Sequence, residues 1–264
     1  MKPYPWVYLS PHLDDAVLSC GGRIWRQVQA GGRVLVVTAF SESPPPGARL
    51  SSFARELHTR WESQVEARGA INEHVATRRT EDLAALAYLG AEAAHWPYPD
   101  CIYRRSLDGR FLYPGEEALW GDVHPGDRGL IGELIGHLAV VPVAQGGEVY
   151  APLEVSHHVD HQILRRAAEA SGQTLTYYED FPYAESPQAI QAALAETRGE
   201  SEIVPLPEEA LVAKINAIAC YRSQVATFWA DADHMAAQVR AFARRTGDGQ
   251  PAERYWKSTW AGNG

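Results

Sequence analysis

The sequence predicts a single Rossmann-like α/β domain over residues 1–264. We expect a mainly parallel sheet with helices on both faces and an active site at the carboxyl ends of its strands. Residues 33–40 are apolar on both faces, which is typical of a strand in a parallel sheet covered by helices. A strand–helix–strand pattern at the start of the chain also returns near its middle, as a repeat of organisation and not of sequence.

The first unit occupies about forty residues at the start of the chain. Residues 6–9 form a short apolar run closed by a Ser-Pro pair, which favours a buried strand. A helix is expected from Asp14 to Ala30, because acidic residues stand at its start and two glycines follow its end. Residues 33–40 supply the second strand of this unit.

The middle of the chain is expected to contain helices and loops. Proline, serine and glycine predict a coil just after the first unit, and a glycine closes the second helix that follows it. We expect a coil over 41–52, helices over 53–72 and 77–90, a long ordered loop over 96–128 and a helix over 128–138.

The second unit is expected to contain a strand over 148–153, a helix over 162–170 and a strand over 174–178. An insertion with one short helix is predicted over about 184–209. A C-terminal helical region follows, with a long helix over 211–229. No linker divides the chain.

Composition and charge exclude several classes of protein. With 24 basic and 33 acidic residues, the formal net charge is −9, so we expect no nucleic-acid partner. No apolar run is long enough to cross a membrane, and the first residues do not resemble a signal peptide. The three cysteines are scattered and form no CxxC pair, which favours a reducing compartment. The predicted location is the cytoplasm.

Two polar clusters directly follow predicted strands. The first is Pro-His-Leu-Asp-Asp at residues 11–15, and the second is His-His-Val-Asp-His at residues 157–161. Ligands of open α/β sheets bind where the carboxyl ends of the strands meet, so we expect the two clusters to lie together. Taken alone, the first cluster also suits a helix-capping turn and the second a solvated loop. Their complementary chemistry favours a shared site.

Imidazole and carboxylate groups are ligands that suit zinc. His12 and Asp15 are three residues apart, and one histidine of the second cluster would complete three ligands with an open position, as in catalytic zinc sites. Asp14 would then accept a proton from water, and a remaining histidine beside Asp160 would stabilise an oxyanion. The residues therefore predict hydrolysis of a carbonyl compound at one zinc ion.

The residues SPHLDD at 10–15, CGG at 20–22 and HVDH at 158–161 resemble the motifs of the PIG-L/LmbE-like zinc de-N-acetylases. The resemblance extends from Val7 to about Tyr183. The family typically has HPDDE and HPDH, whereas this chain has Leu13, Ala16 and Val159 at three of those positions. None of the three is a metal ligand in the family. The departures therefore bear on the identity of the substrate more than on metal binding and the reaction.

The resemblance implies a role for each site residue. Zinc, or alternatively Fe²⁺, would be bound by His12, Asp15 and His161. Asp14 would be the general base, His158 would stabilise or protonate the tetrahedral intermediate, and Asp160 would orient His158. The segment RRTE at 78–81 implies that Arg78, or alternatively Arg79, contacts the substrate. A segment similar to the family's substrate loop implies the same for Asp100. His157 is expected to lie beside the site without binding the metal.

The implied reaction is removal of an N-acetyl group from an amino sugar or glycoside, which releases acetate and a free amine. Two alternatives stay open at this point. One is a zinc amidase that acts on a small amide other than a sugar, and the other is a non-catalytic α/β protein that binds a metal or ligand. The expected partner is a small N-acetylated sugar.

Overall fold

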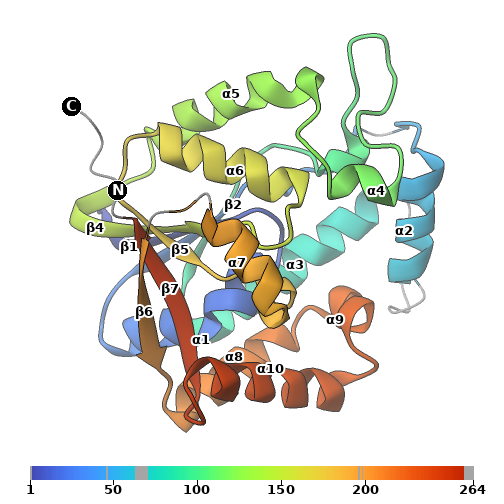
Figure 1. The fold of residues 1–264 in the computed structure, drawn as a ribbon. Coiled ribbons are helices and arrows are strands. Elements are labelled where there is room, and N and C mark those ends of the chain that lie inside the picture. Colours follow the sequence, from blue (N-terminus) through green and yellow to red (C-terminus); the bar gives the residue numbers. More distant parts are fainter. Residues whose placement is uncertain (1, 46, 63–70, 196, 198, 259–264) are drawn as a thin grey trace.

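The computed structural model describes residues 2–45, 47–62, 71–195, 197 and 199–258 (Figure 1). Within these residues, seven strands form one sheet in the order β3-β2-β1-β4-β5-β7-β6. The strands are β1 (Tyr4–Ser10), β2 (Val34–Thr38), β3 (Glu92–His95), β4 (Val143–Pro152), β5 (Leu175–Tyr178), β6 (Gly199–Pro205) and β7 (Ala252–Ser258). Neighbouring strands from β3 to β5 are parallel, and β7 runs antiparallel to both β5 and β6. The predicted α/β fold with a mainly parallel sheet is confirmed.

Helices cover both faces of the sheet, as Figure 1 shows. Helices α5 and α6 lie on one face, and α1, α3 and α8 lie on the other. The helices are α1 (Asp15–Gln29), α2 (Ser52–Glu62), α3 (Ile71–Leu89), α4 (Glu116–Leu119), α5 (Arg128–Leu138), α6 (Val159–Ala170), α7 (Pro187–Ala195), α8 (Glu208–Ile218), α9 (Arg222–Phe228) and α10 (Ala232–Thr246). None of the helices in the described ranges is long and apolar enough to span a membrane.

Strand β2 explains why the core has two halves. All five of its residues are buried, and side chains alternate between the two faces of a strand. Val34 and Val36 pack with α1, α3 and α8, whereas Leu35 and Val37 pack with α5 and α6. The two-sided apolar pattern of this strand therefore reflects one layer of helices on each face.

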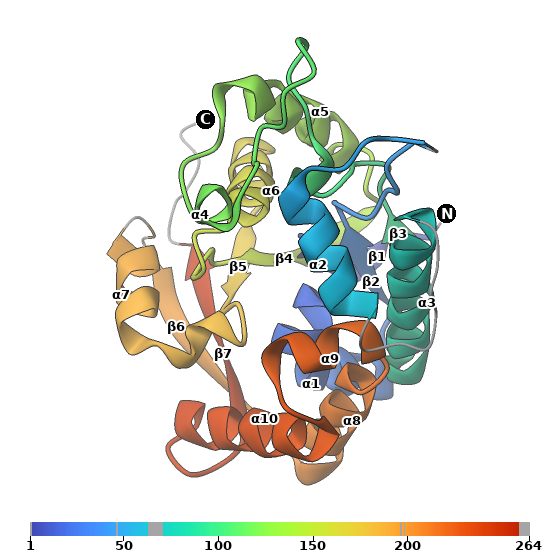
Figure 2. The same cartoon turned by 90° about the vertical axis from the view of Figure 1, so that its right-hand side faces the viewer.

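The chain changes direction in the sheet between β1 and β4. From β1 it continues to β2 on one side, and from β4 it continues to β5 on the other. Such a switch point leaves a crevice at the carboxyl ends of the two strands. Both histidine-containing loops begin there, and Figure 2 shows α2, α4 and α9 on the side of the molecule where the cleft described below opens.

Several predicted elements differ from the structure. The helix predicted over 211–229 is broken, because α8 ends at Ile218 and α9 begins at Arg222. The region over 184–209 contains β6 as well as α7, and the C-terminal region ends in β7. Strand β6 was not predicted because it lies at the sheet edge and has the polar sequence GESEIVP.

The predicted middle helices are also shifted. Helix α2 ends at Glu62, and residues 63–70 of the predicted helix lie outside the described residues. Helix α3 begins at Ile71 and ends as predicted before Gly90, whose φ of +77° suits a glycine that stops a helix. The segment over 96–128 is mostly loop, with α4 and short 3₁₀ turns at Cys101–Tyr103 and Pro125–Asp127.

Candidate metal centre and catalytic cleft

The loop after β1 is folded by its own hydrogen bonds. The hydroxyl of Ser10 donates to the carbonyl of His12 at 2.7 Å and accepts from the backbone N–H of Ala16 at 3.0 Å. The backbone N–H of His12 donates to Oδ2 of Asp15 at 2.8 Å. These bonds bring His12 and Asp15 to the same side of the loop as α1 begins.

The loop after β4 is organised by the start of α6. His158 caps this helix, and its Nδ1 accepts from the backbone N–H of Asp160 at 3.2 Å. The first turn of α6 then carries Asp160 and His161 into the protein interior, where both are buried. His157 lies on the surface and contacts Glu154 at 3.1 Å, away from the other histidines.

The three predicted metal ligands lie together. Oδ2 of Asp15 is 3.3 Å from Nδ1 of His12 and 3.4 Å from Nε2 of His161. The centroids of the two imidazole rings are 5.5 Å apart. Ligand atoms bound at about 2.0–2.1 Å around a tetrahedral zinc ion lie roughly 3.3–3.4 Å apart. The two spacings from Asp15 match that value, and ligand atoms of His12, His158 and His161 also lie within 4.8 Å of one another.

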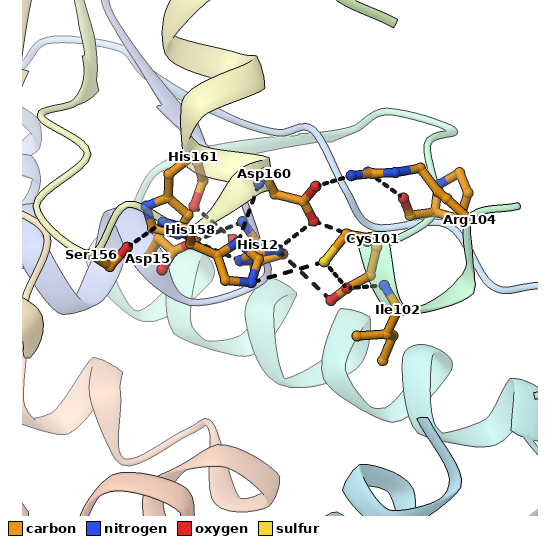
Figure 3. Close-up of polar contacts among 12 residues, drawn as sticks. His12, Asp15, Cys101, Ile102, Arg104, Ser156, His158, Asp160 and His161 are labelled. Carbon is orange, nitrogen blue, oxygen red and sulfur yellow. Dashed lines mark hydrogen bonds and ion pairs between the residues drawn. The ribbon is translucent and has the colours of Figure 1, made fainter. Parts of the chain in front are cut away.

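Each predicted histidine ligand is held through its other ring nitrogen. Nε2 of His12 contacts Oδ2 of Asp160 at 2.9 Å, as Figure 3 shows. Nδ1 of His161 contacts Oδ1 of Asp180 at 2.6 Å. A carboxylate behind the histidine is typical of metal sites, because it fixes the ring and leaves the opposite nitrogen free to bind. This arrangement leaves Nδ1 of His12 and Nε2 of His161 facing Oδ2 of Asp15.

The charges at the site also suit a divalent cation. Burial opposes the charged form of His12, but Asp15 and Asp160 raise its pKa well above the usual value. Burial likewise opposes the charged form of His161, yet Asp15 and Asp180 raise its pKa to about 10. Both imidazoles therefore favour the positively charged form, and a cation bound among the same carboxylates would replace that charge. The donor set fits a metal ion on both geometry and charge.

Asp160 has several partners at the site. The resemblance implies that Asp160 orients His158, and the backbone N–H of Asp160 donates to Nδ1 of that ring at 3.2 Å. Its carboxylate accepts from Arg104 and from the backbone N–H of Cys101, and contacts His12. The reason is geometric, because His158 caps α6 whereas the side chain of Asp160 points toward the loop that carries Cys101 and Arg104 (Figure 3). Asp160 therefore holds His12, one of the predicted ligands.

Asp14 and Arg78 face each other in the cleft. Nη2 of Arg78 is 3.7 Å from Oδ2 of Asp14, and both side chains line the cavity. Burial raises the pKa of Asp14 to about 7, and the positive charge of Arg78 opposes that rise. Nε of Arg78 is buried without a hydrogen-bond partner among the described residues, so it is available to a ligand. Arg79 contacts Glu42 at 3.8 Å and is not among the cavity-lining residues.

Asp100 also lines the cavity. Its Oδ1 accepts from the backbone N–H of Ile102 at 3.1 Å, and its Oδ2 lies 3.8 Å from Nε2 of His12. The carboxylate is therefore fixed at one oxygen, while the other faces the site.

The sequence analysis assigns no role to two residues of the site, Arg104 and Asp180. Arg104 lies in the loop over 96–128 and joins Asp160 to Asp127, whose Oδ2 accepts from its Nε at 2.8 Å. No periodicity or motif marks it. Asp180 follows β5, so the same strand-end rule that identified the two clusters could have found it.

The cleft is walled by side chains from α2, α4, α9 and the segment after β5. Five aromatic side chains line it, and the ring centroid of Trp120 lies 5.2 Å from that of His158. The ring centroid of Tyr183 is 6.4 Å from that of His161. The aromatic wall consists of Phe53, Trp61, Trp120, Tyr183 and Phe228.

Comparisons with known proteins agree with this geometry. The family described as PIG-L, GlcNAc-PI de-N-acetylase, matches residues 7–171. The 2'-N-acetylparomamine deacetylase of Niallia circulans is 28% identical over 187 residues, which cover 67% of this chain and 67% of that protein. The protein of the same name from Streptomyces fradiae is 30% identical over 201 residues, which cover 73% of this chain and 63% of that protein.

Among solved structures, the zinc-inhibited form of teicoplanin deacetylase is 28% identical to this chain. The similarity covers 95% of this chain and 96% of that one, with a TM-score of 0.80. The match to the family thus extends over more than half of the chain and includes both histidine-containing loops. The chain belongs to the PIG-L family of GlcNAc-PI de-N-acetylases.

Proposed function

We propose that this protein is a metal-dependent N-deacetylase that removes an acetyl group from the amine of an amino sugar or glycoside. The observation that carries the proposal is the position of Asp14 and His158. Both line the cavity beside the three predicted ligands, and a purely structural metal site has no need of an added base and hydrogen-bond donor. The names of the relatives, deacetylases of 2'-N-acetylparomamine and teicoplanin, support the same reaction.

We propose zinc as the ion, with Fe²⁺ as the alternative, bound by His12, Asp15 and His161. When bound, zinc supplies a Lewis acid that polarises the acetyl carbonyl and lowers the pKa of the attacking water. Asp160 and Asp180 keep the two ligand imidazoles oriented through their outer nitrogens.

Asp14 acts as the proton acceptor. Its carboxylate is buried beside the ligands and faces Arg78 at 3.7 Å. A pKa of about 7 in the metal-free protein falls when a cation lies nearby, which keeps the carboxylate ionised and able to take a proton from water. The same proton is then available to the departing amine.

His158 donates a hydrogen bond to the carbonyl oxygen as negative charge develops on it. Burial and the neighbouring charge of His12 hold the pKa of His158 well below its usual value, so the ring is neutral. Because its Nδ1 accepts from the backbone N–H of Asp160, its single proton is on Nε2. A neutral ring with a fixed tautomer is a preorganised donor to an oxyanion.

Arg78 and Asp100 are placed to contact the substrate. The unpartnered Nε of Arg78 can donate to a carbonyl or sugar hydroxyl, and Asp100 can accept from a hydroxyl. The aromatic wall provides flat apolar surfaces of the kind that pack against sugar rings. We also propose a cytoplasmic location, which the free cysteines at positions 20, 101 and 220 support.

A substrate panel tests the proposal. Zinc-loaded protein is assayed for acetate and amine release from 2'-N-acetylparomamine, simple N-acetylglucosaminides and acetylated peptides. We expect release from sugars, and a decrease of about 10²–10⁴-fold in kcat for Asp14→Asn with its zinc content unchanged. Release from peptides alone would favour the alternative amidase, and no release from any amide would favour a non-catalytic protein. An unchanged rate in Asp14→Asn would remove Asp14 from the proton-transfer role.

A further inference from the structure

We propose that a second cavity, between α7, α10 and β7, binds a small aromatic carboxylate. Among the residues that the structure describes, this cavity and the catalytic cleft have no lining residue in common. The turn Tyr183–Glu185 lies between them, with Tyr183 on the cleft and Glu185 on the second cavity. The proposal does not depend on the proposed deacetylase function.

The second cavity combines an apolar wall with a few polar groups, as ligand sites commonly do. Ile190 and Leu194 of α7, Phe242 of α10 and Trp256 of β7 supply the large apolar side chains of its lining. Its volume of about 240 Å³ lies below the usual range of about 300–1,000 Å³, so the occupant must be small. Because aromatic side chains pack favourably against another aromatic ring, the wall favours a flat aromatic body.

Arg254 is fixed at the edge of this cavity by a buried carboxylate. Its Nε donates to Oε1 of Glu179 at 2.6 Å, and its Nη2 donates to Oε2 at 3.1 Å. Nε1 of Trp256 donates to Oε1 of the same carboxylate at 3.0 Å. Glu179 is buried and thus holds two side chains of the lining in place. Nη1 of Arg254 takes no part in these bonds, so it remains able to donate to a ligand.

Arg245 of α10 supplies a second guanidinium group. Its Nη2 lies 3.7 Å from Oε1 of Glu185, and the two side chains are 55% and 39% exposed. An exposed ion pair of this kind contributes little to stability. A ligand carboxylate can therefore replace Glu185 as the partner of Arg245 without a large loss.

The charges of the lining favour an anion. Arg245 and Arg254 provide two positive charges, whereas Glu185 is the only acidic side chain among the described residues that line the cavity. Glu179 compensates Arg254 from outside the lining, so Arg245 is the main attraction for a negative group. Guanidinium groups bind carboxylates through paired, charge-assisted hydrogen bonds. An aromatic ring with one carboxylate therefore satisfies both the apolar wall and the two arginines.

Titration of isotope-labelled, zinc-loaded protein with benzoate tests the proposal by NMR. Each of the eight tryptophans gives one indole N–H signal. The variants Trp256→Phe and Trp120→Phe assign the signals of the second cavity and of the catalytic cleft. We expect benzoate to shift the Trp256 signal to saturation. Benzyl alcohol has the same ring without the charge and should need at least about tenfold higher concentrations, because a hydrogen bond to a charged group contributes about that factor or more.

Arg245→Gln removes one charge from an exposed side chain, so the variant should fold normally. It should need at least about tenfold more benzoate for the same shift of the Trp256 signal. Arg244→Gln is the matched control, because Arg244 is exposed in the same last turn of α10 but does not line the cavity. It should bind benzoate as the native protein does.

Three results would overturn the proposal. Benzoate could leave the Trp256 signal unchanged or shift the Trp120 signal alone, which would place it in the catalytic cleft. The native protein and Arg245→Gln could respond equally, which would remove the arginine from the site. Benzyl alcohol could bind as tightly as benzoate, which would remove the preference for a carboxylate. Since binding is read from Trp256, the result does not depend on whether the protein deacetylates a sugar.

Discussion

Replacement of Asp180 by alanine tests how the predicted ligand His161 is held. Oδ1 of Asp180 contacts Nδ1 of His161 at 2.6 Å, and Oδ2 accepts from the backbone N–H of Val155 at 3.1 Å. The carboxylate is almost completely buried, with 1% of the residue exposed. Loss of a carboxylate behind a metal-binding histidine typically lowers metal affinity about 10–100-fold, which corresponds to about 1.4–2.8 kcal/mol.

The same substitution also affects stability. The backbone N–H of Val155 loses its acceptor in a buried position, which costs about 1–3 kcal/mol. Glu179→Ala is the matched control, because Glu179 is the adjacent buried carboxylate but contacts Arg254 and Trp256 rather than a histidine. It should lower the free energy of unfolding without changing zinc affinity.

The assay for both variants is competition with a chelator for zinc, together with urea unfolding of the metal-free proteins. We expect zinc binding to weaken in Asp180→Ala but not in Glu179→Ala. The free energy of unfolding should fall in both variants. Native zinc affinity in folded Asp180→Ala would show that Asp180 does not support the ligand. An equal loss of affinity in Glu179→Ala would show that general destabilisation, and not the His161 contact, lowers binding.

Two further predictions concern proton balance and the cleft wall. Because the pKa of His12 is well above its usual value and that of His161 is about 10, zinc uptake at pH 7 should release about two protons from these rings and about half a proton from Asp14, whose pKa is about 7. An indicator dye in weak buffer measures the release. Zinc affinity should therefore fall as the pH is lowered, and release of no protons would contradict the charge argument. Glu81→Gln should raise KM up to about tenfold with little change in kcat, because Glu81 of α3 accepts from the backbone and hydroxyl of Ser223 and so anchors α9, which lines the cleft. Glu73→Gln on the exposed side of the same helix is the control, and an equal change in both variants would remove α9 from the explanation.

The candidate ligands could be predicted from the sequence because ligands of parallel sheets bind at the carboxyl ends of the strands. His12, Asp15 and His161 each follow a strand, and parallel strands bring their carboxyl ends to one edge whatever the loop details. The contact of Asp160 could not be predicted in the same way. It depends on the loop over 96–128, which carries Cys101 and Arg104 against α6 without any periodic pattern.

The errors in the fold have similar physical causes. The break between α8 and α9 lies in an apolar stretch, so the hydrophobic pattern continues where the helix does not. Strand β7 pairs with β5 and β6, and this partnership is set by tertiary contacts rather than by local sequence. Hydrophobic patterns in the sequence therefore predicted the central parallel strands better than the antiparallel strands at the edge of the sheet.

The central claim is that two loops distant in the sequence bind one divalent ion between them. Anomalous diffraction at the zinc edge, from crystals grown with one equivalent of zinc, tests it most directly. We expect a single peak within bonding distance of Nδ1 of His12, Oδ2 of Asp15 and Nε2 of His161, and no peak there in His161→Ala. A peak at other residues, or full zinc occupancy of this position in His161→Ala, would contradict the account.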